Sequence, residues 1–248
     1  MAPVLLVTGG SRGIGAACCL QAAARGWDVA VNYTRDAAAA GRVATAVRAA
    51  GRRALTVQAD VADEAQVLAM FARVDAELGR LQGLVNNAGV VDRPQRVDEM
   101  DMARWRRQFD INVIGSMLCA REAVRRMSTR HGGRGGAIVN LSSVAVRLGS
   151  AGQYVDYAAA KAAIETFTLG LGRELAAEGV RVNAVRPGII DTEIHASGGL
   201  PDRARELAPL IPMQRPGTAD EVAAAVLWLL SGESSYATGS VVDVTGGR

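Results

Sequence analysis

A tyrosine and a lysine stand four residues apart in the segment DYAAAKAAIE, at Tyr157 and Lys161. Residues with this spacing share one face of a helix, so the phenol and the ammonium are expected to be neighbours. A phenol ionises near pH ~10, and a nearby positive charge lowers that pKa by stabilising the phenolate. The pair therefore predicts a tyrosine that exchanges protons with a substrate.

Lys161 is also the only lysine in the chain, because every other residue among its 28 Lys and Arg is arginine. An ammonium is compact, whereas a guanidinium is a wider, planar group with a different reach. A compact cation could lie beneath the phenol and still donate to ribose hydroxyls. A chance pair is the alternative, since the chain has four tyrosines. The single retained lysine favours a site that arginine cannot serve.

A glycine-rich segment, TGGSRGIG, follows the first apolar run and carries Gly9, Gly13 and Gly15. Such glycines allow a tight strand-to-helix turn and let backbone N–H groups approach a pyrophosphate at the helix N-terminus. A tight turn without a ligand is the alternative. The position between an expected strand and an expected helix favours a dinucleotide site.

The same segment also matches G-x-S-x-G, the nucleophile elbow of a hydrolase. That motif needs earlier strands for part of its oxyanion hole, and only one strand precedes it here. It also needs a base, but the two histidines, His131 and His195, lie in a Gly-rich loop and a polar segment. With two histidines and no C-x-x-C pair, no metal site is expected either.

Two arginines indicate which dinucleotide binds. NAD sites usually place Asp or Glu after the second strand to take the adenosine ribose hydroxyls, whereas this chain has Asn32 there. Arg12 and Arg35 could hold a 2′-phosphate by charge-assisted hydrogen bonds. Solvated arginines are the alternative, above all for Arg35. We expect NADP(H), with NAD(H) as the second choice.

Short apolar runs alternate with longer amphipathic segments along the chain, which predicts an α/β fold. The expected strands lie within residues 3–8, 28–33, 54–59, 83–88, 137–142, 181–186 and 240–245. The expected helices lie within residues 13–25, 36–50, 63–79, 98–130, 153–178 and 218–231. No linker interrupts this alternation. We therefore predict one domain over residues 1–248, a Rossmann-type, doubly wound parallel sheet of about seven strands.

Polar or small residues follow three further strands, where ligands bind in such sheets. Asp60 and Val61 end the third strand and could meet an adenine, although Asp60 could equally cap the next helix. The turn at 86–89 allows close approach of a cofactor. Ser142 and Ser143 close the fifth strand and bring two hydroxyls to the crevice.

The composition argues against several other classes of protein. A net charge of +3, scattered arginines and few aromatic residues do not suit nucleic-acid binding. Three cysteines form no disulfide framework and suit a reducing compartment. The start of the chain lacks the basic region of a signal peptide, and the longest apolar run, 222–230, is too short to span a bilayer. We expect a cytoplasmic protein that binds neither nucleic acid nor membrane.

Several of these motifs occur together in one known family. TGGSRGIG, NNAG, a serine pair followed by YAAAK, and RPG at 186–188 resemble the short-chain dehydrogenase/reductase family, in its NADPH-type subgroup with an arginine in the glycine motif. The resemblance covers essentially the whole chain in the family's order. It implies hydride transfer between a nicotinamide and a carbonyl or alcohol. It also implies a homotetramer, because VTGG near the C-terminus resembles the tail that members pack across a tetramer interface.

The resemblance assigns roles to four side chains. Tyr157 would be the general acid/base, and Lys161 its pKa-lowering, ribose-binding partner. Ser143 would hold the substrate oxygen, and Asn112 matches the family asparagine whose helix distortion seats a proton-relay water. Ser143 lies 14 residues before Tyr157, one more than in many members. Ser142 therefore remains an alternative, and the extra residue should form a bulge in the loop before Tyr157.

The motifs and the resemblance together imply a cofactor site along the ends of the strands. Its expected contacts are Gly9, Ser11, Arg12, Gly13, Ile14, Gly15, Asn32, Tyr33, Arg35, Asp60, Val61, Asn87, Ala88, Gly89, Tyr157, Lys161, Pro187, Gly188, Ile190 and Thr192. A segment over about 191–213, with glycines at 198 and 199 and a proline at 201, is expected to fold over the substrate as a hinged lid.

These observations predict an NADPH-dependent oxidoreductase that reduces a carbonyl to an alcohol. The family resemblance is to 3-oxoacyl-thioester reductases and to sugar dehydrogenases such as glucose dehydrogenase, and the motifs do not choose between these small-molecule substrates. One alternative is an NAD-linked alcohol or sugar dehydrogenase that works in the oxidative direction. The other is a non-catalytic NADP-binding module, against which the complete Asn–Ser–Tyr–Lys set argues.

Overall fold

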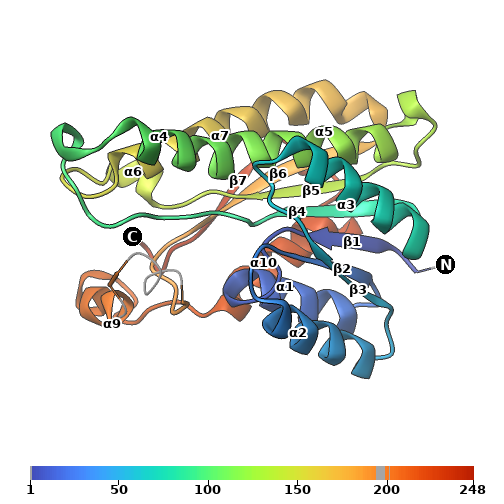
Figure 1. Cartoon of the computed structure of the whole chain (residues 1–248), viewed down its shortest axis with the longest axis horizontal. Coiled ribbons are helices and arrows are strands. Elements are labelled where there is room, and N and C mark those ends of the chain that lie inside the picture. The colour runs from blue at the N-terminus through green and yellow to red at the C-terminus, as the bar shows by residue number, and fades with distance from the viewer. Residues whose placement is uncertain (1, 194–198, 201) are drawn as a thin grey trace.

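A single sheet of parallel strands forms the centre of the molecule in the computed structural model, which describes residues 2–193, 199–200 and 202–248 (Figure 1). The strand order is β3-β2-β1-β4-β5-β6-β7, with seven strands. The strands are β1 Val4–Val7, β2 Asp28–Tyr33, β3 Ala54–Gln58, β4 Leu81–Asn86, β5 Gly136–Leu141, β6 Val180–Pro187 and β7 Val241–Val244. The predicted fold class and number of strands are confirmed.

Helices cover both faces of this sheet (Figure 1). One layer contains α1 Gly13–Ala24, α2 Ala37–Ala49 and α10 Ala219–Leu230. The opposite layer contains α3 Glu64–Glu77, α4 Met102–Phe109, α5 Gly115–Met127 and α7 Val155–Leu175. The chain leaves β1 in one direction to build β2 and β3, and returns past β1 to build β4 and the strands beyond it. A ligand crevice is expected where the strand order divides in this way, between β1 and β4.

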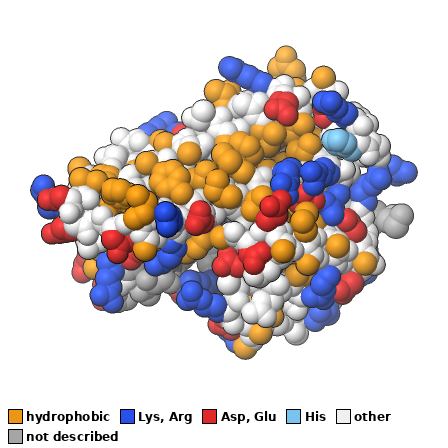
Figure 2. Space-filling view, turned by 45° about the horizontal axis from the view of Figure 1, so that its top comes forward, with side chains coloured by type: hydrophobic (Ala, Val, Ile, Leu, Met, Phe, Trp, Pro, Cys, Tyr) orange, Lys and Arg blue, Asp and Glu red, His pale blue; other side chains and the backbone are white. Residues whose placement is uncertain are grey.

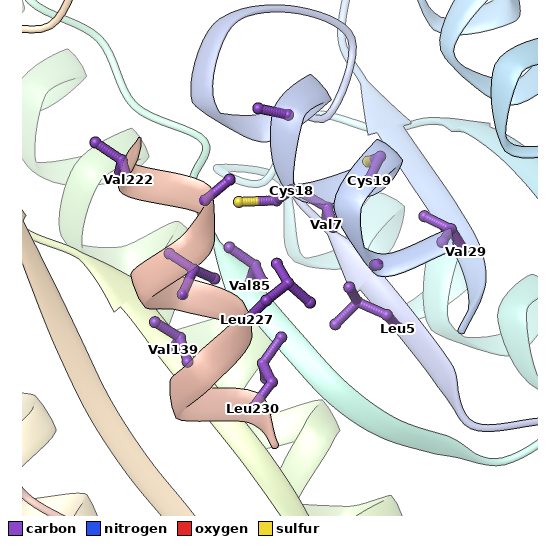
Figure 3. Packing of buried hydrophobic residues seen from close by; sticks show 14 of the residues in the cluster. Leu5, Val7, Cys18, Cys19, Val29, Val85, Val139, Val222, Leu227 and Leu230 are labelled. Atoms are coloured by element: carbon purple, nitrogen blue, oxygen red, sulfur yellow. The ribbon is translucent and has the colours of Figure 1, made fainter. Parts of the chain in front are cut away.

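The two faces of β1 show why the sequences of the strands are continuous apolar runs. Leu5 and Val7 pack into the core on the side of α1 and α10, while Val4 and Leu6 pack into the core on the opposite side. Figure 3 shows the first of these cores, with side chains of α1 and α10 lying over the sheet. Because side chains alternate along a strand and both faces are buried, every position is apolar.

The three cysteines are core residues. Cys18, Cys19 and Cys119 are buried, and none forms a disulfide. Burial raises the pKa of the Cys18 and Cys119 thiols to about 12. Because the thiolate is the reactive form, these side chains act as small apolar groups.

The expected helix over 98–130 is interrupted. Its first part, α4, begins only at Met102 and is capped by Asp101, whose carboxylate accepts a hydrogen bond from the backbone N–H of Arg104 at 2.8 Å. A π-helical turn over Asp110–Ile114 then separates α4 from α5. Two short helices, α6 Ala145–Leu148 and α9 Arg203–Leu207, were not predicted from the sequence.

Part of the expected lid belongs to the portion of the chain that the structure does not describe. The positions 194–198 and 201, which include His195, Gly198 and Pro201, lie outside the described residues. Among the helices that the structure does describe, none combines the length and the apolar character that a membrane-spanning segment requires.

Candidate active site

A cavity of about 330 Å³ lies at the carboxyl ends of β4, β5 and β6, and Ile14 of α1 also lines it. It adjoins the place between β1 and β4 where the division of the strand order predicts a crevice. Among the expected site residues, those that line it are Ile14, Asn87, Gly89, Ser143, Tyr157, Lys161, Pro187, Gly188, Ile190 and Thr192. Those that do not line it are Gly9, Ser11, Arg12, Gly13, Gly15, Asn32, Tyr33, Arg35, Asp60, Val61, Ala88 and Asn112. Within the described residues, no cluster of His, Cys, Asp and Glu could hold a metal ion.

Tyr157 and Lys161 lie in the first two turns of α7 and face the cavity. The ammonium nitrogen lies 5.7 Å from the centroid of the Tyr157 ring. It donates a hydrogen bond of 2.7 Å to the backbone carbonyl of Leu141, at the end of β5. The Lys161 side chain is almost completely buried, with 4% of its surface exposed. The structure therefore brings the pair together on one helix face, as the spacing predicts.

The ionisation of this pair differs from the sequence-based expectation. Burial raises the pKa of the Tyr157 phenol above its ordinary value, and a hydrogen bond with Ser143 only partly opposes this. Burial also lowers the pKa of Lys161 to about 8. The sequence shows that a cation is near but not how far each group is removed from water, and here burial is the largest cause of both pKa shifts.

The two serines after β5, Ser142 and Ser143, differ in their contacts. The Ser142 hydroxyl is buried and donates to Oε1 of Glu165 at 2.5 Å. Ser143 is only half-buried, and its hydroxyl oxygen accepts from the backbone N–H of Ala145 at 3.2 Å. Since the Ser142 proton is committed to a carboxylate, Ser143 is the better donor toward a substrate.

The loop between Ser143 and α7 turns sharply where the sequence predicts a bulge. Gly149, Ser150 and Gly152 all have positive φ, of 65°, 51° and 69°. Such values suit glycine but are uncommon for serine. The turn carries Gln153 and Tyr154 into the wall of the cavity.

Asn112 lies in the π-helical turn, so the helix distortion implied by the resemblance is present. Its amide makes two hydrogen bonds of 3.0 Å with the backbone of Val90, accepting from the N–H and donating to the carbonyl. A Cβ on Gly89 would lie 2.8 Å from the Asn112 amide oxygen and 3.5 Å from the Lys161 nitrogen. The Asn112 amide and the Lys161 ammonium therefore both lie close to Gly89. The proton-relay water that the resemblance implies stays a prediction.

The glycine-rich turn after β1 has room only for glycine. Gly9 and Gly13 have positive φ, of 62° and 52°. A Cβ on Gly15 would lie 2.3 Å from the carbonyl oxygen of Gly9. The side-chain amide of Asn87 donates to the carbonyls of Thr8 and Gly9 at 2.9 and 3.0 Å, which ties this turn to the end of β4. The N-terminus of α1 is thereby presented for an anion, and the residues fit a pyrophosphate.

Asn32 does not have the place that was expected for it. Its side chain is buried, and its oxygen accepts from the backbone N–H of Gly9 at 3.1 Å. Its amide nitrogen donates to the carbonyls of Val57 and Ala59 at 3.3 and 3.0 Å. The side chain therefore joins the glycine turn to β3 instead of facing a ribose. Tyr33, half-buried, ends β2 beside it.

The acidic groups near the expected adenosine site are engaged locally. Asp36 is the first acid after β2, and its carboxylate caps α2 by accepting from the backbone N–H of Ala39 at 2.8 Å. Asp60 accepts from the N–H of Ala62 at 3.0 Å, while the cap of α3 is Asp63. The alternative in which Asp60 caps the next helix is therefore wrong.

A buried ion pair connects α4 to the start of α7, directly before Tyr157. Nε and Nη2 of Arg104 donate to the two carboxylate oxygens of Asp156 at 2.7 and 3.2 Å. The side chains are 6% and 2% exposed. Arg104 also donates to the carbonyl of Arg93 and to the Gln95 side chain, so its charge is well enclosed by acceptors.

Asp156→Asn is expected to lower the free energy of unfolding by about 3 kcal/mol, because removing one partner leaves a buried charge without its counter-ion. Urea unfolding followed by circular dichroism measures this. The control is Glu77→Gln in the exposed Arg73–Glu77 pair, which should cost less than about 0.5 kcal/mol. Equal, small losses in both variants would contradict a role for the buried pair.

One charged network at the site was missed by sequence reasoning. Glu165 accepts from the Ser142 hydroxyl and from Nε and Nη2 of Arg186, at 2.8 and 2.7 Å for the arginine. Arg186 also donates to Asp243 in β7 at 2.5 Å. Glu165 follows Lys161 by four residues, which places it on the same helix face. That spacing was a visible signal, whereas the pairing with Arg186 depends on how α7 packs on β6.

Comparisons with known proteins agree with this geometry. A family model described as enoyl-(acyl carrier protein) reductase matches residues 9–248. The chain is 54% identical over 245 residues to the uncharacterized oxidoreductase YgfF of Escherichia coli, covering 99% of each. It is 41% identical to cis-4-hydroxycyclohexanecarboxylate dehydrogenase of Sinomonas cyclohexanicum, covering 98% of this chain and 95% of that one. A short-chain dehydrogenase from Burkholderia cenocepacia in complex with NADP superimposes with a TM-score of 0.90 at 35% identity, covering 99% and 97% of the chains.

Proposed function

Because this chain belongs to the short-chain dehydrogenase/reductase family, we propose that it reduces a carbonyl to an alcohol with NADP(H) as the hydride carrier. The observation that carries the proposal is the meeting of Ser143, Tyr157 and Lys161 at one cavity, beside a glycine turn that fits a pyrophosphate. This set supports catalysis over a module that only binds the cofactor.

In the proposed reaction, bound NADPH supplies a hydride to the carbonyl carbon. Ser143 donates a hydrogen bond to the carbonyl oxygen and holds it beside the phenol. Tyr157 transfers its proton to that oxygen as the C–H bond forms, which yields the alcohol and a phenolate. Lys161 stabilises the phenolate through its charge and is held in place by the carbonyl of Leu141. Proton transfer by such a group contributes typically ~10²–10⁴-fold to a rate.

The ionisation of Tyr157 fits the proposed role as an acid. Burial raises the pKa of the phenol, so the group is protonated at neutral pH, which is the form that donates to a carbonyl oxygen. The relative from Sinomonas cyclohexanicum is named for the dehydrogenation of a hydroxy acid, so the test includes alcohols.

The test is nicotinamide absorbance with a panel of carbonyls plus NADPH or NADH, and of alcohols plus NADP⁺ or NAD⁺. The proposal expects NADPH consumption with at least one class of carbonyl at neutral pH. Activity only with NAD⁺ and alcohols would replace it by the oxidative dehydrogenase. Tight NADPH binding without any turnover would favour the alternative of a non-catalytic NADP-binding module.

The charges near the expected adenosine ribose support NADP(H). Arg12 precedes the first residue of α1, and Arg35 follows β2 by two residues; both side chains are exposed. No acidic residue occurs at 32–35, and Asp36 is occupied as the cap of α2. Although Asn32 itself points inward, the absence of a carboxylate at this turn still favours a 2′-phosphate.

We expect NADPH to bind at least about tenfold tighter than NADH, because a charge-assisted hydrogen bond contributes roughly 1.5–3 kcal/mol, or about 10- to 150-fold in affinity. Arg12→Ala should remove most of this preference and leave NADH affinity nearly unchanged, and Arg35→Ala should do less. Fluorescence titration of both cofactors measures it, with the exposed Arg42→Ala as a charge-matched control. The preference should shrink with added salt. A wild type without preference would defeat the NADP proposal.

The surface supports the proposed homotetramer. Figure 2, which turns the face formed by α4, α5 and α7 toward the viewer, shows a band of hydrophobic side chains across it. Met102, Phe109 and Ile114 are 56%, 39% and 45% exposed. Trp228 and Tyr236, near β7, are exposed as well. Two separate apolar regions suit the two interfaces of a symmetric tetramer, and light scattering tests the mass.

A further inference from the structure

The charged side chains of the described residues that line the cavity are all cations, namely Lys161, Arg203 and Arg248, and no acidic side chain is among them. Elsewhere arginines commonly pair with acids, as in the buried Arg104–Asp156 pair. A cavity lined only by cations attracts an anion, and partial burial strengthens the attraction.

Arg203 is fixed in place without being neutralised. It is the first residue of α9, and its guanidinium lies 5.1 Å from the centroid of the Tyr154 ring. Nη2 donates to the side-chain oxygen of Gln153 at 2.7 Å. Within the part of the chain that the structure describes, no acidic side chain pairs with it. A stacked guanidinium with N–H groups to spare is suited to binding a carboxylate.

Arg248 has an unsatisfied donor at the same cavity. Its Nη1 is shielded from solvent and has no hydrogen-bond partner among the described residues. The segment before it is held against the cavity wall, since a Cβ on Gly188 would lie 2.8 Å from Cα of Thr245. Buried polar groups nearly always have a partner, and a charged donor without one points to a ligand.

The anion site lies close to the proposed reacting group. Tyr154, on which Arg203 stacks, precedes Tyr157 by three residues, which is about one helical turn or ~5 Å along α7. Apolar side chains complete the lining, among them Val91, Val144 and Ile189. One cavity therefore combines hydroxyl groups that can hold a substrate oxygen, apolar side chains and two arginines in its lining.

We propose that the substrate is a small oxo acid, or the corresponding hydroxy acid, whose carboxylate is bound by Arg203 and Arg248 while its carbonyl or hydroxyl group meets Ser143 and Tyr157. The reaction in this proposal rests on the proposed function, whereas the binding of the acid by the two arginines does not. A phosphate of the cofactor is the other source of an anion. The glycine turn already fits the pyrophosphate, and Arg203 borders Gln153 and Tyr154 in the loop before α7.

The first experiment compares turnover of acids with that of neutral analogues. The probes are 4-oxopentanoate, 5-oxohexanoate and 3-oxocyclohexanecarboxylate, each beside its carboxamide, with NADPH in excess. At least one acid should exceed its amide in kcat/KM by at least about tenfold, as one charge-assisted hydrogen bond predicts. In Arg203→Met and Arg248→Met that ratio should fall toward one, mainly through KM. Arg205→Met, on the same helix but 90% exposed, is the charge-matched control and should keep the ratio.

The second experiment measures binding and does not depend on turnover. Isothermal titration of the NADP⁺ complex with cyclohexanecarboxylate and cyclohexanecarboxamide should show at least about tenfold tighter binding of the acid. Both Met variants should lose that difference while keeping the wild-type Kd for NADP⁺.

Equal binding of acid and amide by the wild type, or an acid preference that survives in both variants, overturns the proposal. A large loss of NADP⁺ affinity would assign the arginines to the cofactor and also overturn it. If no carbonyl is reduced but the acid binds through these arginines, only the proposed reaction fails.

Discussion

Tyr157→Phe is expected to lower kcat for carbonyl reduction by roughly 10²–10⁴-fold, the usual contribution of a general acid. Phenylalanine keeps the ring that packs near Lys161 but removes the proton that Tyr157 is proposed to pass to the substrate oxygen. The hydride then arrives at a carbonyl whose developing negative charge is relieved only by Ser143 and by the nearby ammonium. Steady-state turnover with saturating NADPH measures the loss.

Two further measurements separate a chemical effect from a structural one. The Kd of NADPH should stay near the wild-type value in Tyr157→Phe, because the variant keeps the ring and every other expected cofactor contact. Tyr236→Phe, which removes the hydroxyl of a tyrosine that is exposed in the single chain and does not line the cavity, is the matched control and should turn over normally. A Tyr157→Phe enzyme with more than about a tenth of wild-type kcat would show that another group supplies the proton.

The local parts of the fold could be predicted from the sequence because their signals are local. β1 is recognisable since both of its faces are buried, which requires an unbroken apolar run. The glycine turn is recognisable since Gly9 and Gly13 need positive φ and Gly15 has no room for a Cβ. Tyr157 and Lys161 are recognisable since four residues of helix bring any such pair to one face.

The orientation of single side chains could not be predicted, because distant segments set it. Asn32 points inward since Val57 and Ala59, about 25 residues further along, offer it carbonyls. The choice between Ser142 and Ser143 depends on Glu165, which reaches Ser142 because α7 packs on β6. Arg203 and Arg248 meet at the cavity through the segments that follow β6 and β7.

The degree of burial was the other quantity that the sequence could not supply. The spacing of Tyr157 and Lys161 correctly indicates a neighbouring cation, and it suggested a lowered phenol pKa. In the structure both groups are removed from water, so each favours its neutral form more than it would at the surface. The result is a phenol with a raised pKa beside a lysine whose pKa is about 8.

Lys161→Arg is expected to lower kcat by at least roughly 10²-fold although it keeps the positive charge. The ammonium lies between the carbonyl of Leu141 at 2.7 Å and the Tyr157 ring, and a Cβ on Gly89 would already be 3.5 Å away. A planar guanidinium is wider than the ammonium that these groups surround, so we expect it to displace the phenol or the backbone of Gly89. Arg173→Lys, near the exposed end of α7, is the reverse exchange and should leave turnover unchanged.

The pH dependence of Lys161 gives a readout that a merely structural effect would not produce. Its pKa of about 8 in the folded protein lies below the ordinary 10.5, so kcat of the wild type should fall as pH rises through about 8 and the ammonium is lost. The residual activity of Lys161→Arg should not fall in this pH range, since arginine stays charged.

The same pKa shift predicts that folding stability rises with pH where kcat falls. Between pH 8 and 10.5 the unfolded chain binds more protons at this residue than the folded one, so stability rises with pH. The free energy of unfolding of the wild type, relative to Lys161→Met, should therefore increase across this window. Two results together would contradict this role of Lys161: a difference in unfolding free energy that does not vary with pH, and a wild-type kcat that does not fall above about pH 8. They would indicate that the Lys161 ammonium is solvated and takes no part in proton transfer.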